Sequence, residues 1–312
     1  MTRVAALDCG TNSIRLLIAD VDDGVVTDVV RTMEIVRLGQ GVDKTGRLDD
    51  AALERTFAAA ERFGVLMREH NVERSKFVAT AATRDAENSD VFVDGIVARL
   101  GVTPSVITGR MEAELGYRGA LSAGRGWEAP ALTVDIGGGS TEFVLGRGES
   151  IESMISVPMG CVRMTERHVT SDPVPVAGAD AIRADVRGLL DEVGGVVDFG
   201  SVATLVGLAG SITTVTAEAL HLESYQPQYI DGARIPVDEA LHAADFFVTA
   251  PRAVRLARGF MHPGRVDVIA SGAIVWSEII TRVARDVAAR GGELVDVVTS
   301  ERDILDGIAL TA

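Results

Sequence analysis

The sequence predicts an α/β fold built from two domains, and three observations support this prediction. The chain has 312 residues, a length at which two domains, each with its own hydrophobic core, are expected. Short apolar segments alternate with longer segments of helical periodicity, a pattern typical of sheets covered by helices. One strand–turn–strand pattern occurs twice, near the start of each half. We therefore expect two related domains, each with a mixed sheet covered by helices.

The repeated pattern is Asp-x-Gly-x-x-Ser between two apolar strands. The first copy lies in residues 4–20, VAALDCGTNSIRLLIAD, and the second in residues 131–147, ALTVDIGGGSTEFVLGR. The alignment matches Asp8 with Asp135, Gly10 with Gly137, Ser13 with Ser140, and Arg15 with Glu142. A single copy would mean little, but two copies, each between strands, indicate two structurally related halves.

The remaining elements alternate between helices and strands. In the first half we expect helices at residues 51–70, 89–100 and 111–123, and strands at residues 76–80 and 106–108. In the second half we expect helices at residues 177–193, 211–220, 237–249, 254–257 and 273–290, and strands at residues 204–207 and 266–269.

A glycine- and proline-rich stretch at residues 122–130, SAGRGWEAP, precedes the second copy and predicts a linker. We therefore place the N-terminal domain at residues 1–125 and the C-terminal domain at residues 126–312. The last helix of the C-terminal domain could pack against the N-terminal domain.

The composition excludes several classes of protein. The net charge of −15, from 30 basic and 45 acidic residues, argues against general nucleic-acid binding, which needs a basic face. No apolar run approaches the roughly 20 residues of a membrane span, and the N-terminus lacks a secretory pattern. The two cysteines, Cys9 and Cys161, form neither a disulfide framework nor a zinc motif. We expect a cytoplasmic protein that has neither a nucleic-acid nor a membrane partner.

Three consecutive glycines, Gly137, Gly138 and Gly139, form the turn of the second copy. Backbone N–H groups in such a turn form a concavity for anions, and the missing side chains let phosphate oxygens approach. Asp135 and Glu142 would repel a bare phosphate, so a divalent cation is the natural mediator, and hard oxygen ligands suit Mg²⁺. The alternative is a tight hairpin with solvated acids, and the repetition of the turn favours the anion site over it.

A third glycine-containing loop, LVGLAGSITT at residues 205–214, follows a strand and opens a helix. Gly210 and Ser211 would lie at the N-terminus of that helix, where the dipole and the free N–H groups favour anions. Ordinary helix capping is the alternative, because Gly-Ser also precedes helices without any ligand.

Eight segments, in chain order, carry a resemblance to a known family: ALDCGTNSIRLLI, ATAATRDAENS, ITGRMEAELGYRGA, DIGGGSTEFVLG, VPMGCVRMTE, VGLAGSITTVTA, HPGRVDVIASGAI and ERDILDGIAL. They cover essentially the whole chain, which resembles the exopolyphosphatase/guanosine pentaphosphate phosphatase family of the actin, sugar kinase and heat-shock ATPase superfamily. The resemblance implies two actin-like (ribonuclease H-like) α/β domains and an interdomain cleft. It further implies the short form of the family, without the C-terminal helical domain of longer members.

The resemblance also implies a reaction, the removal of a terminal phosphate by water with Mg²⁺ or Mn²⁺ as the cation. The family's base is the glutamate before the alanine of a Gly-x-Glu-Glu-Ala segment, here GRMEA, so the role falls on Glu112. Met111 replaces the other glutamate, and the loss of one like charge is expected to lower the pKa of Glu112. Arg84 resembles the arginine that contacts the transferred phosphoryl group. Without the resemblance, Glu112 would be a dipole-favouring acid, and Arg84 a partner of Asp85 or Glu87.

The resemblance assigns the remaining site residues in two groups. The metal ligands would be Asp135, Glu142 and Asp8. The phosphate-binding residues would be Asn12, Ser13, Arg15, Gly137, Gly138, Gly139, Ser140, Thr141, Gly210 and Ser211. A separate set of arginines, Arg252, Arg255, Arg258 and Arg265, is either a phosphate-binding stripe or a solvated helix face.

The leading hypothesis is an exopolyphosphatase that shortens inorganic polyphosphate from its ends. The close alternative is a guanosine pentaphosphate 5'-phosphohydrolase with the same base and loops, for which Tyr225 and Tyr229 are the candidates to stack on the nucleobase. An ATPase or kinase of the same superfamily, and a non-catalytic polyphosphate or nucleotide sensor, are further alternatives. We expect a homodimer, and the apolar helix at residues 273–287 is either its interface or part of the core.

Overall fold

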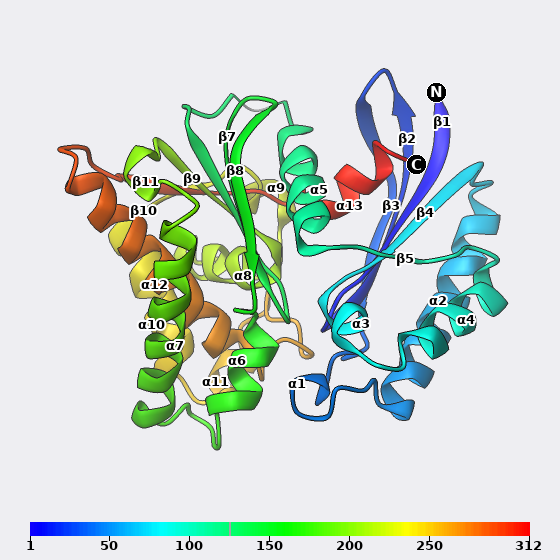
Figure 1. The fold of residues 1–312 in the computed structure, drawn as a ribbon, viewed down its shortest axis with the longest axis horizontal. Helices are drawn as coiled ribbons and strands as arrows, with labels where there is room; N and C mark the ends of the chain where they lie inside the picture. Colours follow the sequence, from blue (N-terminus) through cyan, green and yellow to red (C-terminus); the bar gives the residue numbers. More distant parts are fainter. Residues whose placement is uncertain (125) are drawn as a thin grey trace. The chain divides into compact units, whose positions relative to one another are not determined.

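The computed structural model describes residues 1–124 and 126–312, and it divides into two compact α/β units (Figure 1). Unit 1 comprises Met1–Gly124 and Arg302–Ala312, and unit 2 comprises Arg125–Glu301. The expected domain boundary falls at residue 125, which lies outside the described residues. The sequence analysis placed the C-terminal segment in the second domain, whereas the division of the structure assigns Arg302–Ala312 to unit 1.

Unit 1 contains a five-stranded mixed sheet with the strand order β3-β2-β1-β4-β5. Its strands are β1 (Thr2–Cys9), β2 (Ser13–Asp22), β3 (Val25–Ile35), β4 (Arg74–Ala79) and β5 (Ser105–Val106). Its helices are α1 (Val42–Thr45), α2 (Asp50–Glu69), α3 (Ala81–Asp85), α4 (Ser89–Leu100), α5 (Gly109–Leu121) and α13 (Ile304–Ala309). Strand β2 is antiparallel to both β1 and β3, whereas β4 is parallel to β1 and β5 is parallel to β4.

Both faces of the unit 1 sheet are buried, and the alternation of side chains along β1 decides which residue lies on which face. Leu7 and Cys9 pack into the core that also contains residues of α2 and α4. Val4 and Ala6 belong to the other core cluster, which contains residues of α5 and α13. Asp8 continues this second series, so its carboxylate lies on the face of the sheet that α5 and α13 cover.

Unit 2 contains a six-stranded mixed sheet with the order β10-β11-β9-β6-β7-β8. Its strands are β6 (Ala131–Ile136), β7 (Thr141–Arg147), β8 (Ser150–Val157), β9 (Thr204–Leu208), β10 (Arg234–Pro236) and β11 (Asp296–Thr299). Its helices are α6 (Cys161–His168), α7 (Val176–Gly194), the 3₁₀ helix η1 (Phe199–Ser201), α8 (Ala209–Ala219), α9 (Pro227–Ile230), α10 (Val237–Thr249), α11 (Arg252–Leu256) and α12 (Ile269–Ala288). Helices α7, α10 and α12 lie together in Figure 1 and share one apolar cluster with the sheet.

The two sheets repeat one topology, as the duplicated motif predicts. The order β3-β2-β1-β4-β5 corresponds to β8-β7-β6-β9-β11, with the same pattern of parallel and antiparallel neighbours. Even the register irregularities are equivalent, because one lies between Ile18 and Ala19 and the other between Leu145 and Gly146. In the alignment of the repeat, Ile18 falls on Leu145. The prediction of two related halves is confirmed.

The structure decides two expectations about the second half, one by its secondary structure and one by the burial of side chains. The strand expected at residues 266–269 is wrong, since residues 266–268 form a turn and Ile269 begins α12. A run of four apolar residues is compatible with either element, and periodicity alone does not separate them. The apolar side chains of α12, among them Ile274, Trp276 and Ile279, are fully buried inside unit 2. The sequence left open whether this helix forms a dimer interface or part of the core, and its burial shows that it belongs to the core of unit 2.

Candidate active site

The two copies of the repeated motif form closely similar hairpins. In the β1–β2 hairpin Asp8 pairs directly with Arg15, and in the β6–β7 hairpin Asp135 pairs directly with Glu142. The turns close in the same way, because the Gly10 N–H donates to the Ser13 carbonyl at 2.9 Å and the Gly137 N–H donates to the Ser140 carbonyl at 3.0 Å. Each unit therefore carries a pair of cross-strand polar side chains at the base of a glycine turn.

Asp8 is the buried carboxylate of unit 1, with 4% of its surface exposed. Its Oδ2 accepts a hydrogen bond from Nε of Arg15 at 2.9 Å and forms an ion pair with Nη2 of the same guanidinium at 2.8 Å. Its Oδ1 is buried and has no hydrogen-bond partner among the described residues. Arg15 also donates, through Nη1, to the carboxylate of Asp303. The guanidinium that the sequence assigned to phosphate binding is thus held between two carboxylates.

Glu112 lies in the first turn of α5, which begins two residues earlier than expected because Thr108 caps it by accepting from the Met111 N–H at 3.3 Å. Arg84 lies near the end of α3, and its Nη1 donates to Glu112 Oε2 at 3.2 Å and to the carbonyl of Ile107 at 2.9 Å. Arg84 and Glu112, the two expected catalytic residues, are therefore direct partners.

The environment of Glu112 raises the pKa of its carboxyl to about 7. Burial is the main cause, since only 14% of the side chain is exposed, and the charge of Asp8 raises the pKa further. Arg84 and the hydroxyl of Thr80 act in the opposite direction. Met111, which stands where the family has a second glutamate, is 50% exposed. A carboxylate with a pKa near neutrality suits a general base.

The glycine turn of unit 2 is fixed from behind by the start of α6. The N–H groups of Cys161 and Val162 donate to the carbonyls of Gly137 and Gly138, at 3.0 and 2.9 Å. A side chain on Gly160 would overlap the backbone of Gly138, so only glycine fits there.

With the carbonyls engaged, the amides of the turn remain open. The N–H groups of Gly138, Gly139 and Ser140 have no hydrogen-bond acceptor within the described part of the chain. Three consecutive open N–H groups are what an anion-binding concavity requires.

The other predicted residues of this hairpin are engaged within unit 2. Glu142 is buried, and its Oε1 accepts from the hydroxyl of Ser156 at 2.6 Å. The hydroxyl of Thr141 donates to the carbonyl of Met159 at 2.6 Å, which ties β7 to the segment before α6. Asp135 is partly buried and lies opposite Glu142.

Helix α8 opens at the third loop, as expected. Ala209 has a φ of 66°, a left-handed conformation that is uncommon for a residue with a side chain and is often found at functional sites. Ser211 is buried, and the guanidinium of Arg265 lies against Gly210 and donates to the hydroxyl of Thr214 at 2.9 Å.

The four arginines considered as a phosphate-binding stripe do not form one. Arg252 pairs with Asp267 at 2.7 Å, Arg258 pairs with Glu218 at 2.7 Å, and Arg255 is buried against Asp172. Carboxylates thus neutralise three members of the set. The fourth, Arg265, lies apart from them at the start of α8.

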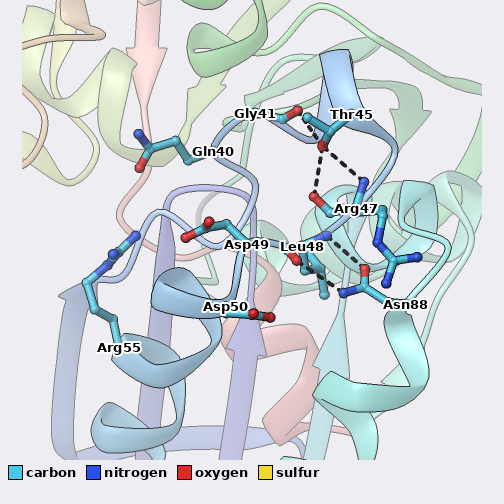
Figure 2. A pocket seen from close by; sticks show the side chains of 9 residues that line it. All are labelled: Gln40, Gly41, Thr45, Arg47, Leu48, Asp49, Asp50, Arg55 and Asn88. Atoms are coloured by element: carbon cyan, nitrogen blue, oxygen red, sulfur yellow. Dashed lines mark hydrogen bonds between the residues drawn. The ribbon is translucent and has the colours of Figure 1, made fainter.

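Figure 2 shows a pocket of about 700 Å³ in unit 1, which is distinct from the predicted site. It is lined by residues at the start of α2 and in the loop before it, together with Asn88, whose side-chain amide bonds the backbone N–H and carbonyl of Leu48 at 2.8 and 3.1 Å. None of the predicted site residues lines it.

The described residues contain neither a ready-made cluster of metal ligands nor a helix that could span a membrane. Among residues 1–124 and 126–312, no group of three or more His, Cys, Asp or Glu side chains could hold a metal ion by itself. Mg²⁺ commonly uses one or two carboxylates, with water and substrate phosphates as the remaining ligands, so the orphaned Oδ1 of Asp8 fits such an ion. Over the same residues, no helix has the length and apolar character needed to cross a membrane.

The sequence analysis missed Asp303 and Thr80. Asp303 and Arg15 are 288 positions apart in the chain, so no local sequence pattern could predict their contact. Asp303 does lie in the segment ERDILDGIAL, one of those that carry the family resemblance, and there it caps α13. Thr80 follows β4 directly, the position that polar site residues often take at the end of a parallel strand.

Comparison with known proteins agrees with these features. The model of the Ppx/GppA phosphatase family matches residues 17–292. Exopolyphosphatase 2 of Mycobacterium tuberculosis is 46% identical over 321 aligned positions, which cover 100% of this chain and 98% of that protein. A guanosine-5'-triphosphate,3'-diphosphate pyrophosphatase of Vibrio atlanticus is 36% identical over 164 positions, which cover 53% of this chain and 33% of that protein.

A crystal structure described as an exopolyphosphatase-like protein superposes with a TM-score of 0.96 at 44% identity, covering 99% of this chain and 97% of the other. The two-domain actin-like α/β fold expected from the sequence is confirmed. The family match extends over most of the chain, and the similarity to Exopolyphosphatase 2 extends over its whole length. The chain is therefore a phosphoanhydride hydrolase that belongs to the Ppx/GppA phosphatase family.

Proposed function

We propose that the enzyme is an exopolyphosphatase, which removes the terminal phosphate of inorganic polyphosphate by water that Glu112 activates. The observation that carries the proposal is the partly buried pair of Glu112 and Arg84, in which the carboxyl has a pKa of about 7. The substrate follows from the relative named Exopolyphosphatase 2, which matches this chain from end to end.

In this mechanism Glu112 accepts a proton from water as its oxygen attacks the terminal phosphorus. The bond between that phosphorus and the bridging oxygen breaks, and the shortened chain leaves with the bonding electron pair. Arg84 stabilises the negative charge on the equatorial oxygens of the transferred group. Little covalent chemistry is required of the protein, so most of the rate enhancement comes from positioning and charge stabilisation.

We further propose that a divalent cation, Mg²⁺ or Mn²⁺, is held by Asp8, Asp135 and Glu142 together with substrate oxygens and water. The ion would neutralise part of the phosphate charge when bound. The open N–H groups of Gly138, Gly139 and Ser140 would bind phosphate oxygens, as would Asn12, Ser13, Gly210 and Ser211. Asp8 supports the cation most directly, since its buried Oδ1 has no hydrogen-bond partner among the described residues.

Hydrolysis of guanosine pentaphosphate is the second candidate, supported by the Vibrio atlanticus relative. We favour polyphosphate, because that relative matches only about half of this chain. The two tyrosines considered for stacking differ in their surroundings: Tyr225 donates its hydroxyl to Thr213 at 2.9 Å and to Glu301 at 2.6 Å, and Tyr229 is 60% exposed. A non-catalytic sensor is disfavoured because Glu112 and Arg84 are both present and paired.

The test is phosphate release from polyphosphate, guanosine pentaphosphate and ATP, each with and without Mg²⁺. We expect the highest kcat/KM for polyphosphate and a requirement for the cation. Glu112→Gln should lower kcat by about 10²- to 10⁴-fold while binding is retained, the range expected for loss of a general base. Undiminished turnover in this variant would reject the role of Glu112, and a preference for ATP would reject the substrate.

Two further expectations remain proposals. We propose a cytoplasmic location, which agrees with two buried free cysteines, Cys9 and Cys161. We also propose a homodimer, which light scattering coupled to gel filtration would test.

A further inference from the structure

We propose that Asp303 is a positioning residue for the reaction, acting through Arg15 to keep one oxygen of Asp8 available to a divalent cation. The inference rests on the proposed function, because it assigns Asp8 to that cation. It concerns a residue in the C-terminal segment of the chain, far in sequence from the glycine hairpins.

The hydrogen-bond geometry around Asp8 is asymmetric. A guanidinium usually meets a carboxylate side by side, with one N–H to each oxygen. Here Nε and Nη2 of Arg15 both converge on Oδ2 of Asp8, at 2.9 and 2.8 Å, and Oδ1 is left without a partner among the described residues. Some other interaction must therefore hold the guanidinium away from the side-by-side arrangement.

Asp303 provides that interaction. Its Oδ2 accepts from Nη1 of Arg15, on the side of the guanidinium that does not reach Asp8. The guanidinium is thereby fixed between two buried carboxylates, since 4% of Asp8 and 5% of Asp303 are exposed. An arginine with a single carboxylate partner would be free to turn and bond both oxygens of Asp8, which would occupy the position offered to the cation.

The backbone around Asp303 is rigid enough to serve this purpose. Asp303 is the N-cap of α13 in a capping box, in which its Oδ1 accepts from the Leu305 N–H at 3.0 Å and its own N–H donates to Asp306 at 3.1 Å.

Helix α13 is also packed tightly on α5, the helix that carries Glu112. A side chain on Gly119 would overlap the carbonyl of Asp303, and one on Gly307 would overlap the carbonyl of Leu115. The two helices therefore meet backbone to backbone. The same contact that places Asp303 against Arg15 also sets the position of α5.

The direct test is Asp303→Asn, which keeps an oxygen to cap α13 and removes the charge that holds Arg15. The matched control is Asp306→Asn in the same helix, since Asp306 is a buried carboxylate that pairs with Arg31 and Arg302. If Asp306→Asn fails to fold, Arg302→Gln removes one of the same ion pairs from a more exposed side chain.

The readout is Mn²⁺ affinity of the full chain without substrate, measured by electron paramagnetic resonance, beside kcat and KM for polyphosphate. Asp303→Asn should weaken Mn²⁺ binding by about ten-fold or more, the usual effect of removing an outer partner of a metal ligand. Asp306→Asn should lower the melting temperature and leave Mn²⁺ affinity within about two-fold of wild type.

A second comparison separates positioning from a simple effect of charge. In an Arg15→Gln background, Asp303→Asn should cause no further loss of Mn²⁺ affinity, because Asp303 acts through Arg15. An additive loss, or equal losses in Asp303→Asn and Asp306→Asn, would overturn the inference. So would unchanged Mn²⁺ affinity with a changed KM for polyphosphate, which would make Arg15 a phosphate ligand instead. Wild-type protein that releases no phosphate from polyphosphate would reject the proposed function, which is a different outcome from either of these.

Discussion

Burial of Glu112 has two opposite consequences. It raises the pKa of the carboxyl, which makes the carboxylate a stronger base, and it lowers the stability of the folded chain when the carboxyl is ionised. Its pKa is about 7, against an ordinary value of 4.5, and burial outweighs the favourable charge of Arg84. The same carboxylate in solvent would be a weaker base toward water at neutral pH. A residue of this kind is typical of an active site, where stability is given up for chemistry.

This cost predicts a pH-dependent gain in stability for Glu112→Gln. Between pH 4.5 and 7 the folded chain keeps a proton that the unfolded chain has lost, so the free energy of unfolding of wild type falls as pH rises. The full cost to the free energy of unfolding, roughly 3 kcal/mol for a shift of this size, is present above pH 7. The glutamine variant carries no charge and avoids it. Urea unfolding of both proteins at pH 5 and pH 8 should show that the free energy of unfolding of the variant, relative to that of wild type, is higher at pH 8 than at pH 5. A difference between the two proteins that is independent of pH would contradict the raised pKa.

At the scale of elements, the two hairpins show how a short motif determines both the closure of a turn and the pair of side chains that face each other across the strands. The spacing Asp-x-Gly-x-x-Ser places the aspartate at a strand end and closes the turn through a glycine N–H and a serine carbonyl, in both units. The polar side chain two positions after the serine then lies directly opposite the aspartate. In unit 1 that position is Arg15, and in unit 2 it is Glu142, so one scaffold carries two different kinds of pair.

The contact between α6 and the glycine turn predicts a large effect of a small substitution. A methyl group at Gly160 would overlap the backbone of Gly138, so Gly160→Ala must displace the turn or the start of α6. We expect a loss of roughly 1–3 kcal/mol in stability and a drop in kcat/KM of about ten-fold or more. Gly188→Ala is the control, because Gly188 lies on α7 with nothing near its Cβ position, and alanine there should stabilise by about 0.5–1 kcal/mol. Equal behaviour of the two variants in stability and activity assays would contradict the role given to Gly160.

A feature could be predicted from the sequence when it depends on residues that are close together in the chain, and it could not when its partners are far apart in the chain. The register of Asp135 with Glu142 and the helix that carries Glu112 depend on neighbouring residues, and they were predictable from spacing. The roles of Arg84 and Glu112 came from the family resemblance, and nothing in the sequence predicted that these two side chains, 28 positions apart, form a pair. Asp303 lies 288 positions from Arg15, and nothing local to either residue indicates the contact. The strand expected at residues 266–269 failed because four apolar residues fit the first turn of a buried helix equally well.

At the scale of the whole molecule, the chain is strongly acidic, with a net charge of −15, whereas the substrate that we propose is a polyanion. The long-range field would repel polyphosphate, so its binding would rely on local groups and on a cation. The open N–H groups of the turn at Gly138–Ser140 and the free oxygen of Asp8 are such groups.

The dependence of kcat/KM for polyphosphate on pH tests most directly the claim that Glu112, buried beside Arg84, is the base that activates water. Only the ionised carboxylate can accept the proton, and its pKa is about 7 in the free enzyme. Measured from pH 5 to pH 9 at saturating Mg²⁺, kcat/KM should rise about ten-fold per unit at low pH and level off well above pH 4.5, because burial, the main cause of the raised pKa, persists when the cation neutralises Asp8. A profile that is flat across this range, or one that levels off near pH 4.5, would contradict the account.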